Sequence, residues 1–327
     1  MAATVAACYR PRLLEDMQCD ICRCLLYRPV ITPCGHSFCR CCLERAYDHS
    51  QVCASCRQPL PSPVVLFTQG KHHLLAALVK LWFPRELDVR AAMALRDQPL
   101  GHFVDYRLHL RGALVPIYVC SLVFPGMPCY LHVFEPRYRL LIRRCWMGAR
   151  RFGMVCSWPP LAEGERPPID RPCYREYGTM LWIERVRFLA DGRMVVLTRA
   201  ERYFRVARIE PQLDGYNMAS VVWAEDSDVP RPYGLLARQE REHDDINLAQ
   251  AAALVYARMQ RYRARLTRAQ CQEMDSVYGT IPSSSVQALS YWAASVLPID
   301  KHIRYNALMA GSVRNRLLFI MEWLDML

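Results

Sequence analysis

The chain has 327 residues, 52% of them hydrophobic and 22% charged, and these proportions predict a folded protein of two or three domains. Its formal net charge of +11 would permit binding to nucleic acid, but the charge falls once cysteine thiolates bind metal ions. Residues 1–8 lack the length and early positive charge of a secretory signal, and the longest apolar stretch, Ala113–Pro125, is too short for a membrane span. We therefore expect a reducing compartment, cytoplasmic or nuclear, and no membrane segment.

After an N-terminal tail of residues 1–18, residues 19–56 contain nine of the sixteen cysteines. Three C-x2-C pairs and one C-x-H pair offer eight ligand positions, enough for two closed tetrahedral zinc sites. These positions are Cys19, Cys22, Cys34, His36, Cys39, Cys42, Cys53 and Cys56. Cys24 and Cys41 break the spacing and are interpreted as bystanders. Disulfides and a redox-active C-x-x-C are the alternatives, but three successive pairs with an embedded C-x-H favour zinc.

The order of seven cysteines and one histidine, together with the segment TPCGHSFCRCC at residues 32–42, resembles a RING finger. The resemblance implies a small cross-braced module over residues 19–60 that binds two zinc ions. In this pairing Cys19, Cys22, Cys39 and Cys42 bind one ion, and Cys34, His36, Cys53 and Cys56 bind the other. Interleaved sites suit a segment that is too small to bury a core of its own.

RING fingers bind a ubiquitin-charged conjugating enzyme and promote transfer of ubiquitin to lysine, so the resemblance implies a RING-type ubiquitin ligase. Ile21 matches the usual apolar contact with the conjugating enzyme, and Arg57 matches the arginine that bridges this enzyme and ubiquitin. Ala46 and Ala54 depart from the bulky apolar residue and the proline that are common there, which weakens the expected contact by about 1 kcal/mol. A RING kept only for folding or dimerisation is the alternative.

Residues 61–112 are predicted to be a linker that contains an amphipathic helix. The segment HHLLAALVKLWFP places apolar side chains at helical spacing until Pro84, and this stripe is expected to pack on the RING or on the following domain. His72 and His73 are interpreted as a solvated helix start, since the eight-ligand set is already complete.

Residues 113–225 show strand-like runs around a single helix. The runs are VPIYVC, RFGMVCSW, TMLWIERVRFLADGRMVVLT and RYFRVARIE, and Asp191-Gly192 is expected at a hairpin turn. Pro136 is expected to begin the helix. The apolar face of this helix comprises Tyr138, Leu141, Ile142 and Cys145. Several strands with one helix among them favour a small barrel over an alternating α/β sheet.

The segments LHVFEPRYRLLIRRC, RFGMV, ADGRMVV, RYFRVARIEPQLDGYN and YWAASVLPID resemble the N-terminal substrate-binding domain of Lon proteases. With a RING in front, the chain resembles the LON-domain and RING-finger protein family. The resemblance implies a multidomain α+β fold in which the RING precedes a PUA-like β-barrel lobe at residues 113–225 and an α-helical lobe at residues 226–327. Ala200 stands where the family tends to have glycine, a departure that affects the turn expected there.

The Lon resemblance implies selection of protein substrates, misfolded proteins included, without ATPase or protease activity. The sequence contains no G-x-x-x-x-G-K-[ST] motif, and Ser283–Ser285 form a serine run without a partner base. The expected partners are a conjugating enzyme, ubiquitin and a protein substrate, and dimerisation through the RING stays open.

The helical lobe raises a second interpretation of the chain. Residues 233–270 carry a helical pattern with an arginine stripe, and a second basic cluster lies around residue 145. The stripe comprises Arg258, Arg261, Arg265 and Arg268, and the cluster comprises Arg143, Arg144, Arg150 and Arg151. The alternative function is a non-catalytic zinc-binding scaffold whose basic surfaces bind nucleic acid or acidic proteins. No base-reading module accompanies the arginines, so solvated helix faces are favoured and nucleic acid is not expected as a partner.

Overall fold

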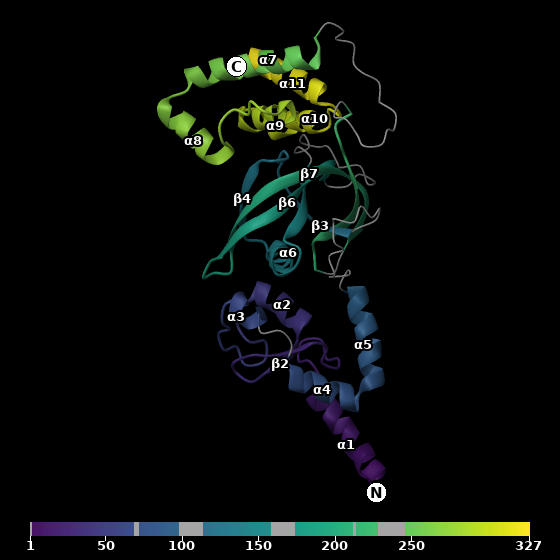
Figure 1. Ribbon diagram of the computed structural model, residues 1–327. Helices are drawn as coiled ribbons and strands as arrows, with labels where there is room; N and C mark the ends of the chain where they lie inside the picture. The colour runs from purple at the N-terminus through teal and green to yellow at the C-terminus, as the bar shows by residue number, and fades with distance from the viewer. Residues whose placement is uncertain (1, 69–71, 98–113, 158–173, 212–213, 228–245) are drawn as a thin grey trace, which may run out of the picture.

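The computed structural model describes residues 2–68, 72–97, 114–157, 174–211, 214–227 and 246–327. Three parts follow one another along the molecule in Figure 1. We call them the N-terminal module (residues 2–97), the barrel lobe (residues 114–223) and the helical lobe (residues 246–327). Within the described residues, no helix has the combination of length and hydropathy that crossing a bilayer requires.

The N-terminal module is a small two-stranded sheet surrounded by helices and loops. Its elements are α1 (Ala2–Asp16), β1 (Pro29–Ile31), β2 (Ser37–Cys39), α2 (Arg40–His49), α3 (Pro63–Thr68), α4 (His73–Trp82) and α5 (Pro84–Asp97). The core joins Phe38 and Leu43 with side chains from beyond residue 60, namely Phe67, Val79 and Phe83. Residues 61–112 were predicted to be a linker, but the described part of this segment thus supplies part of the core of the module.

Helix α4 forms where the apolar spacing predicted it and packs on the zinc-binding region. The imidazole of His72 accepts a hydrogen bond from the backbone N–H of Leu75 (3.2 Å), so this histidine caps the helix. Val79 is buried in the module core. The helix ends at Trp82, and Pro84 begins α5 because its fixed φ and missing N–H suit a first helical turn.

The barrel lobe is built on one six-stranded sheet that closes on itself. Its elements are β3 (Leu114–Cys120), β4 (Pro128–Val133), α6 (Pro136–Met147), β5 (Arg151–Ser157), β6 (Tyr174–Phe188), β7 (Met194–Pro211) and β8 (Asn217–Trp223). The strand order is β4-β7-β6-β5-β3-β8, and a further pairing of β7 with β8 closes the barrel. Helix α6 begins at Pro136 and buries Tyr138, Leu141, Ile142 and Cys145, the face that the sequence predicted. The small barrel with a single helix among its strands that the sequence predicted is confirmed.

Two glycines let the barrel fill its interior with one aromatic ring. A Cβ on Gly153 would lie 2.7 Å from the ring of Phe204, and a Cβ on Gly178 would lie 2.3 Å from the carbonyl oxygen of Met154. Phe204 is fully buried. Any larger side chain at either glycine would displace the ring or separate β5 from β6.

Two expectations for this lobe were wrong. The segment RYFRVARIE is not a separate strand, because β7 runs without interruption from Met194 to Pro211 and bends from its pairing with β4 to its pairing with β8. Ala200 lies inside this strand and is buried, with its N–H bonded to the carbonyl of Met127 (2.9 Å). No turn occurs at this position, so an alanine fits there without strain.

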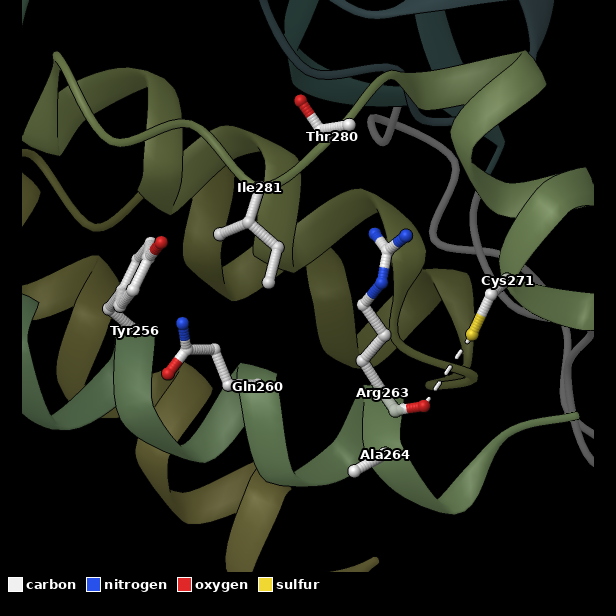
Figure 2. A pocket seen from close by; sticks show the side chains of 7 residues that line it. All are labelled: Tyr256, Gln260, Arg263, Ala264, Cys271, Thr280 and Ile281. Carbon is white, nitrogen blue, oxygen red and sulfur yellow. Dashed lines mark hydrogen bonds between the residues drawn. The ribbon is translucent and has the colours of Figure 1, made fainter. Parts of the chain in front are cut away.

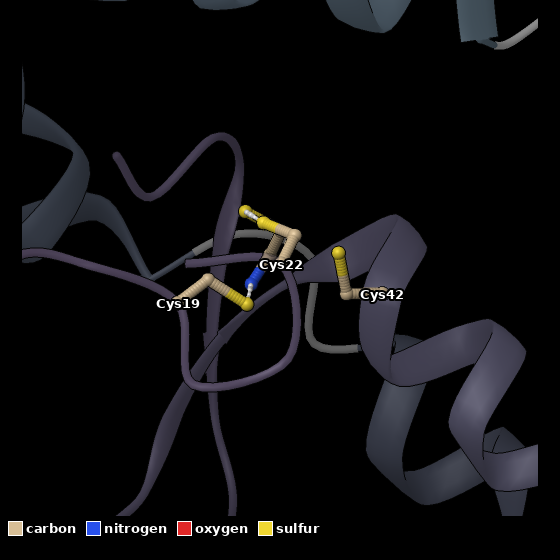
Figure 3. Close-up of side chains that lie close together, drawn as sticks. Cys19, Cys22 and Cys42 are labelled. Atoms are coloured by element: carbon tan, nitrogen blue, oxygen red, sulfur yellow. Dashed lines mark hydrogen bonds between the residues drawn. The ribbon is translucent and has the colours of Figure 1, made fainter. Parts of the chain in front are cut away.

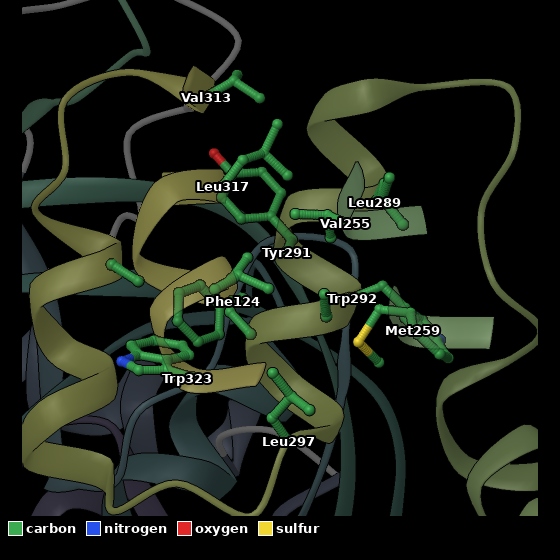
Figure 4. Close-up of a cluster of buried hydrophobic side chains, with 14 of the residues drawn as sticks. Phe124, Val255, Met259, Leu289, Tyr291, Trp292, Leu297, Val313, Leu317 and Trp323 are labelled. Carbon is green, nitrogen blue, oxygen red and sulfur yellow. The ribbon is translucent and has the colours of Figure 1, made fainter. Parts of the chain in front are cut away.

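The helical lobe packs five helices around buried aromatic rings (Figure 4). The helices are α7 (Leu248–Arg265), α8 (Arg268–Tyr278), α9 (Val286–Val296), α10 (Lys301–Leu308) and α11 (Val313–Met326). Trp292 is fully buried, and Phe124 from the loop before β4 joins the same cluster. This loop therefore connects the core of the barrel lobe to that of the helical lobe.

The helical pattern over residues 233–270 does not form one long helix. In the described part, α7 ends at Arg265 and Leu266 is extended. Thr267 then starts α8 with a capping box in which its side chain accepts from the N–H of Gln270 (3.3 Å). Residues 233–245 of the predicted pattern lie outside the described residues.

A buried ion pair holds the segment after β8 against the helical lobe. Arg316 and Asp226 are fully buried and 2.6 Å apart, and Tyr203, Tyr291 and Gln287 also donate to this carboxylate. Burial alone would raise the pKa of Asp226, but the hydrogen bonds and charge of Arg316 outweigh burial and lower it. The carboxylate is therefore ionised and fully paired.

Candidate metal centre and its surroundings

The structure brings the eight predicted ligands together in two groups of four. The ligand atoms within each group all lie within 4.8 Å of one another. One group is Cys19, Cys22, Cys39 and Cys42, and the other is Cys34, His36, Cys53 and Cys56. The grouping is the cross-braced one that the resemblance implied, with each group drawing on two separate segments of the chain.

The spacing of the donor atoms fits tetrahedral zinc. The sulfurs of Cys22 and Cys39 are 4.0 Å apart, and Nδ1 of His36 is 3.5 Å from the sulfur of Cys34. A tetrahedral Zn²⁺ ion with bonds of about 2.3 Å to sulfur and 2.0 Å to nitrogen requires separations of about 3.8 and 3.5 Å. Figure 3 shows the sulfurs of the first group approaching one another from the loop at Cys19 and from the start of α2.

Local backbone turns aim the paired cysteines. The N–H of Arg23 donates to the carbonyl of Cys19, and the N–H of Arg57 donates to the carbonyl of Cys53, each at 2.8 Å. Both arginines follow the second cysteine of a C-x2-C pair and have positive φ, 56° and 61°. The left-handed residue closes each turn and points both sulfurs inward.

Polar neighbours stabilise the thiolate forms of two of the ligands, Cys19 and Cys34. The N–H of Cys39 donates to the sulfur of Cys19 (3.3 Å). Hydrogen bonds from Thr32 and then from His36 lower the pKa of the Cys34 thiol to about 6. Because metal ions bind thiolates, these contacts favour ligation near neutral pH.

Arg90 was missed by sequence reasoning. This residue on α5 is 8% exposed, and its guanidinium donates to the sulfur of Cys22 at 3.5 Å. A zinc ion with four thiolates carries two negative charges, which a buried arginine offsets. The two residues are 68 positions apart, so no spacing motif could have joined them.

The two bystander cysteines lie outside both groups. The thiol of Cys24 donates to the carbonyl of Cys22 (3.3 Å), and Cys41 is buried in the module core. Neither sulfur belongs to either ligand group among the described residues. Both residues therefore serve as matched controls for the ligands.

The predicted contacts with the conjugating enzyme are distributed over two loops and a helix. Ile21 is 38% exposed, Ala54 and Arg57 are exposed, and Ala46 is half-buried on α2. The hydroxyl of Ser55 donates to the carboxylate of Asp20 (2.5 Å) and ties the loop of Ile21 to that of Ala54. The structure thus holds Ile21, Ala54 and Arg57 on two linked zinc loops.

An ionic interface joins the N-terminal module to the barrel lobe. On α2, the buried Asp48 accepts hydrogen bonds from Arg143 through its carboxylate and from Arg139 through its backbone carbonyl. Arg144 of α6 pairs with Asp214 (2.6 Å), which also binds Arg45 of α2. Burial raises the pKa of Asp48 to about 6 despite both arginines, whereas Arg144 and Arg45 overcome burial and lower the pKa of Asp214.

Part of the predicted basic cluster is therefore not a solvated surface. Arg143 is 2% exposed and its guanidinium lies over the rings of Tyr47 and Phe67, so it cannot meet an external anion. Arg144 is also largely covered by its acidic partners. In the arginine stripe of the helical lobe, Arg258 pairs with Asp325 (2.6 Å). The scaffold alternative thus loses part of the basic surface on which it depended.

The barrel lobe covers the side of α2 that is opposite Ala46. At 100° per residue, Ala46 is about 160° around the helix from both Glu44 and Asp48. Glu44 and Asp48 face α6, since Arg143 and Arg144 bind them. Ala46 is therefore turned away from α6 of the barrel lobe.

Replacing Arg143 with alanine is expected to destabilise the full chain by about 2 kcal/mol, because a buried charged hydrogen bond is lost while Asp48 keeps Arg139. Urea unfolding with tryptophan fluorescence measures the change. Arg137→Ala is the matched control, since Arg137 also lies on α6 but forms an exposed pair with Glu135 and should change stability by less than about 0.5 kcal/mol. Equal losses for the two variants would contradict the buried role of Arg143.

The helical lobe has a pocket of about 520 Å³ (Figure 2). It is lined by Tyr256, Gln260, Arg263, Ala264, Cys271, Thr280 and Ile281. Two of its polar side chains are paired, since Arg263 binds Asp275 and the thiol of Cys271 donates to the carbonyl of Arg263 (3.5 Å).

Fold and site together define a two-part protein, a metal-binding cross-braced module followed by a barrel and a helical lobe. Comparison with known families gives the same division. Residues 19–56 match the C3HC4 zinc finger (RING finger), and residues 114–326 match the substrate-binding domain of ATP-dependent protease La (LON). The chain belongs to the family of proteins with a Lon substrate-binding domain, and its N-terminal module is a RING finger whose two ligand groups fit two zinc ions.

The chain is also similar to individual proteins. A LON peptidase N-terminal domain and RING finger protein of Schizosaccharomyces pombe is 27% identical over 339 residues, which cover 96% of this chain and 63% of that protein. The E3 ubiquitin-protein ligase ORTHRUS-LIKE 1 of Arabidopsis thaliana is 42% identical over 50 residues, covering 15% of this chain and 11% of the relative. A Lon N-terminal domain protein from Xanthomonas campestris, a solved structure, is 22% identical with a TM-score of 0.42, covering 64% and 98% of the two chains.

Proposed function

We propose that this chain is a RING-type E3 ubiquitin-protein ligase in which the Lon-like domain selects the protein substrate. The observation that supports it most is the pair of linked zinc loops, which hold Ile21 and Arg57 exposed in the full chain. A conjugating enzyme can approach these loops without displacing another described part of the chain. The name of the plant relative, an E3 ubiquitin-protein ligase, agrees with the proposal.

The RING acts by positioning and not by covalent chemistry. The amine of a lysine attacks the thioester carbonyl of charged ubiquitin, an isopeptide bond forms, and the thiolate of the conjugating enzyme leaves. Zinc has no part in these bond changes, and it only fixes the loops. Ile21 offers an apolar contact for the conjugating enzyme, and the forked guanidinium of Arg57 can donate to carbonyls of two proteins at once.

The two alanines reduce the contact area of this surface. Ala54 is exposed and Ala46 is half-buried, and each carries only a methyl group. We therefore infer weaker binding of the conjugating enzyme than for a RING with larger residues, on the order of 1 kcal/mol. This loss of binding free energy is smaller than the about 2 kcal/mol or more that removal of a single hot-spot residue produces.

The proposal predicts that Arg57→Ala slows discharge of charged conjugating enzymes at least tenfold, and that Ile21→Ala has a similar effect. Discharge onto free lysine is the assay, because the chain has only three lysines of its own, Lys71, Lys80 and Lys301. A panel of conjugating enzymes is tested with the full chain. The zinc content of each variant is measured in parallel.

Arg23→Ala is the matched control for Arg57→Ala. Arg23 also follows the second cysteine of a C-x2-C turn, also has positive φ, and its side chain is 77% exposed. It should leave the discharge rate within twofold of the parent. Lack of discharge by the parent chain with every enzyme in the panel would contradict the ligase and favour a zinc-binding scaffold.

A further inference from the structure

Strand β4 is an unpaired edge of the barrel sheet. It lies at the end of the strand order, its one partner among the described residues is β7, and Figure 1 draws it at the margin of the barrel. Most natural proteins cover such an edge or place charges on it, because it can pair with another chain. Here the exposed positions of the strand carry aromatic rings instead.

The register identifies which backbone groups of β4 are free. The N–H of Ala200 donates to Met127, so hydrogen-bonded pairs with β7 recur at every second residue, at Cys129, Leu131 and Val133. The backbone N–H and C=O groups of Tyr130 and His132 therefore point away from β7. No described segment pairs with them.

The same residues carry an apolar surface. Leu131 and Val133 are buried towards α6, whereas Tyr130 is 63% exposed and Phe134, just beyond the strand, is 61% exposed. His132 lies between them, with its ring centre 6.3 Å from that of Phe134. Free backbone groups and exposed rings thus coincide on one edge.

The neighbouring strands add positive charge to this face. Tyr130 is opposite Leu197 and His132 is opposite Val195, and on the next strand the partners of these two residues are Arg185 and Arg187. Both arginines are exposed, and no ion pair joins either of them to another described residue. The face therefore favours an acidic occupant over a basic one.

We infer that β4 is a docking edge for an extended protein segment, which adds as a strand beside Tyr130 and His132. The segment would place apolar side chains against Tyr130 and Phe134 at alternate positions and would carry acidic residues. Such segments are exposed in unfolded proteins. This inference rests on the proposed function and deepens it, since it names the kind of substrate segment that the Lon-like domain would select.

A second copy of the chain is a poorer occupant than such a segment. Strand β4 contains no acidic residue, so a second β4 would bring no charge partner for Arg185 and Arg187. An acidic extended segment supplies such a partner at the same edge.

The test measures binding of a fluorescein-labelled ten-residue peptide, in which Phe or Val alternates with Glu, to the full chain by fluorescence anisotropy. The second probe is the same peptide with its backbone N-methylated at alternate residues, so that one of its edges cannot donate hydrogen bonds. The N-methylated peptide should bind the parent chain at least tenfold more weakly. Binding of both peptides within twofold would overturn the inference.

The protein variant for this test is His132→Pro, which removes the backbone N–H that points to the free edge. Because this N–H makes no hydrogen bond with β7, an edge strand tolerates the proline. It should weaken peptide binding at least tenfold while the discharge of the conjugating enzyme stays unchanged. Leu81→Ser, at an apolar residue of α4 that is 74% exposed, is the control and should bind the peptide within twofold of the parent.

The remaining outcomes separate this inference from the proposed function. Discharge without peptide binding would overturn the docking edge and leave the ligase intact. Peptide binding that depends on His132, without discharge, would support the docking edge and count against the ligase. Light scattering could instead show that the parent chain is a dimer, that His132→Pro dissociates it, and that no peptide binds. This result would assign the edge to a second copy and overturn the inference.

Discussion

Removal of zinc is expected to unfold the RING finger while the barrel lobe and the helical lobe stay folded. Structural zinc sites contribute on the order of 10–16 kcal/mol of binding free energy, as much as the whole stability of an ordinary domain. The core of the N-terminal module surrounds the ligands, with Cys19, Cys39 and Cys53 fully buried within it. The two lobes have cores of their own and contain none of the ligands.

Hydrogen exchange with and without a chelator measures this effect, together with zinc content by atomic emission. Cys42→Ser should reduce the content from two ions per chain to one or none. Cys24→Ser, at a half-buried cysteine outside both groups, should keep two ions. Amides of Phe38 and Leu43 that stay protected after chelation would show that the module folds without metal.

Asp226→Ala is expected to lower the free energy of unfolding by about 3–5 kcal/mol, because the guanidinium of Arg316 stays charged and buried without its carboxylate partner. Tyr203 and Tyr291 would lose an acceptor in the same step. The pair joins the segment after β8 to α11, so the variant should also loosen the contact between the barrel lobe and the helical lobe. Chemical denaturation with circular dichroism measures the change.

Two comparisons identify the cause of this loss. The double variant Asp226→Leu with Arg316→Leu should be less destabilised than Asp226→Ala, because it leaves no unpaired buried charge. Arg258→Ala, which breaks a pair with the exposed Asp325, should change stability by less than about 1 kcal/mol. A double variant as unstable as the single one would attribute the loss to packing instead of charge.

The zinc ligands could be predicted from the sequence because each pair is local. A C-x2-C turn fixes two sulfurs within four residues, and the structure shows these turns closed by Arg23 and Arg57. Helix α6 was predictable for the same reason, since Pro136 and a 3.6-residue repeat of buried side chains are local signals.

Partners that are distant in the chain could not be predicted. Arg90 donates to a cysteine 68 residues away, and Arg143 binds an aspartate 95 residues away. On sequence alone, Arg143 and Arg144 are as consistent with a solvated cluster as with a buried interface. Whether the two arginines are solvated or buried depends on the positions of Asp48 and Asp214 in the fold. The spacing of residues in the sequence does not predict these positions.

The sequence by itself determined the RING finger, its eight candidate ligands and the order of barrel and helices, because ligand spacing, turn chemistry and hydrophobic periodicity act within a few residues. Only the tertiary structure decided that β7 is one continuous strand that closes the barrel, and that α6 covers the acidic side of α2. It also decided that β4 keeps a free edge. These features depend on pairing between segments far apart in the chain, where burial and charge complementarity select the partner and local propensity does not.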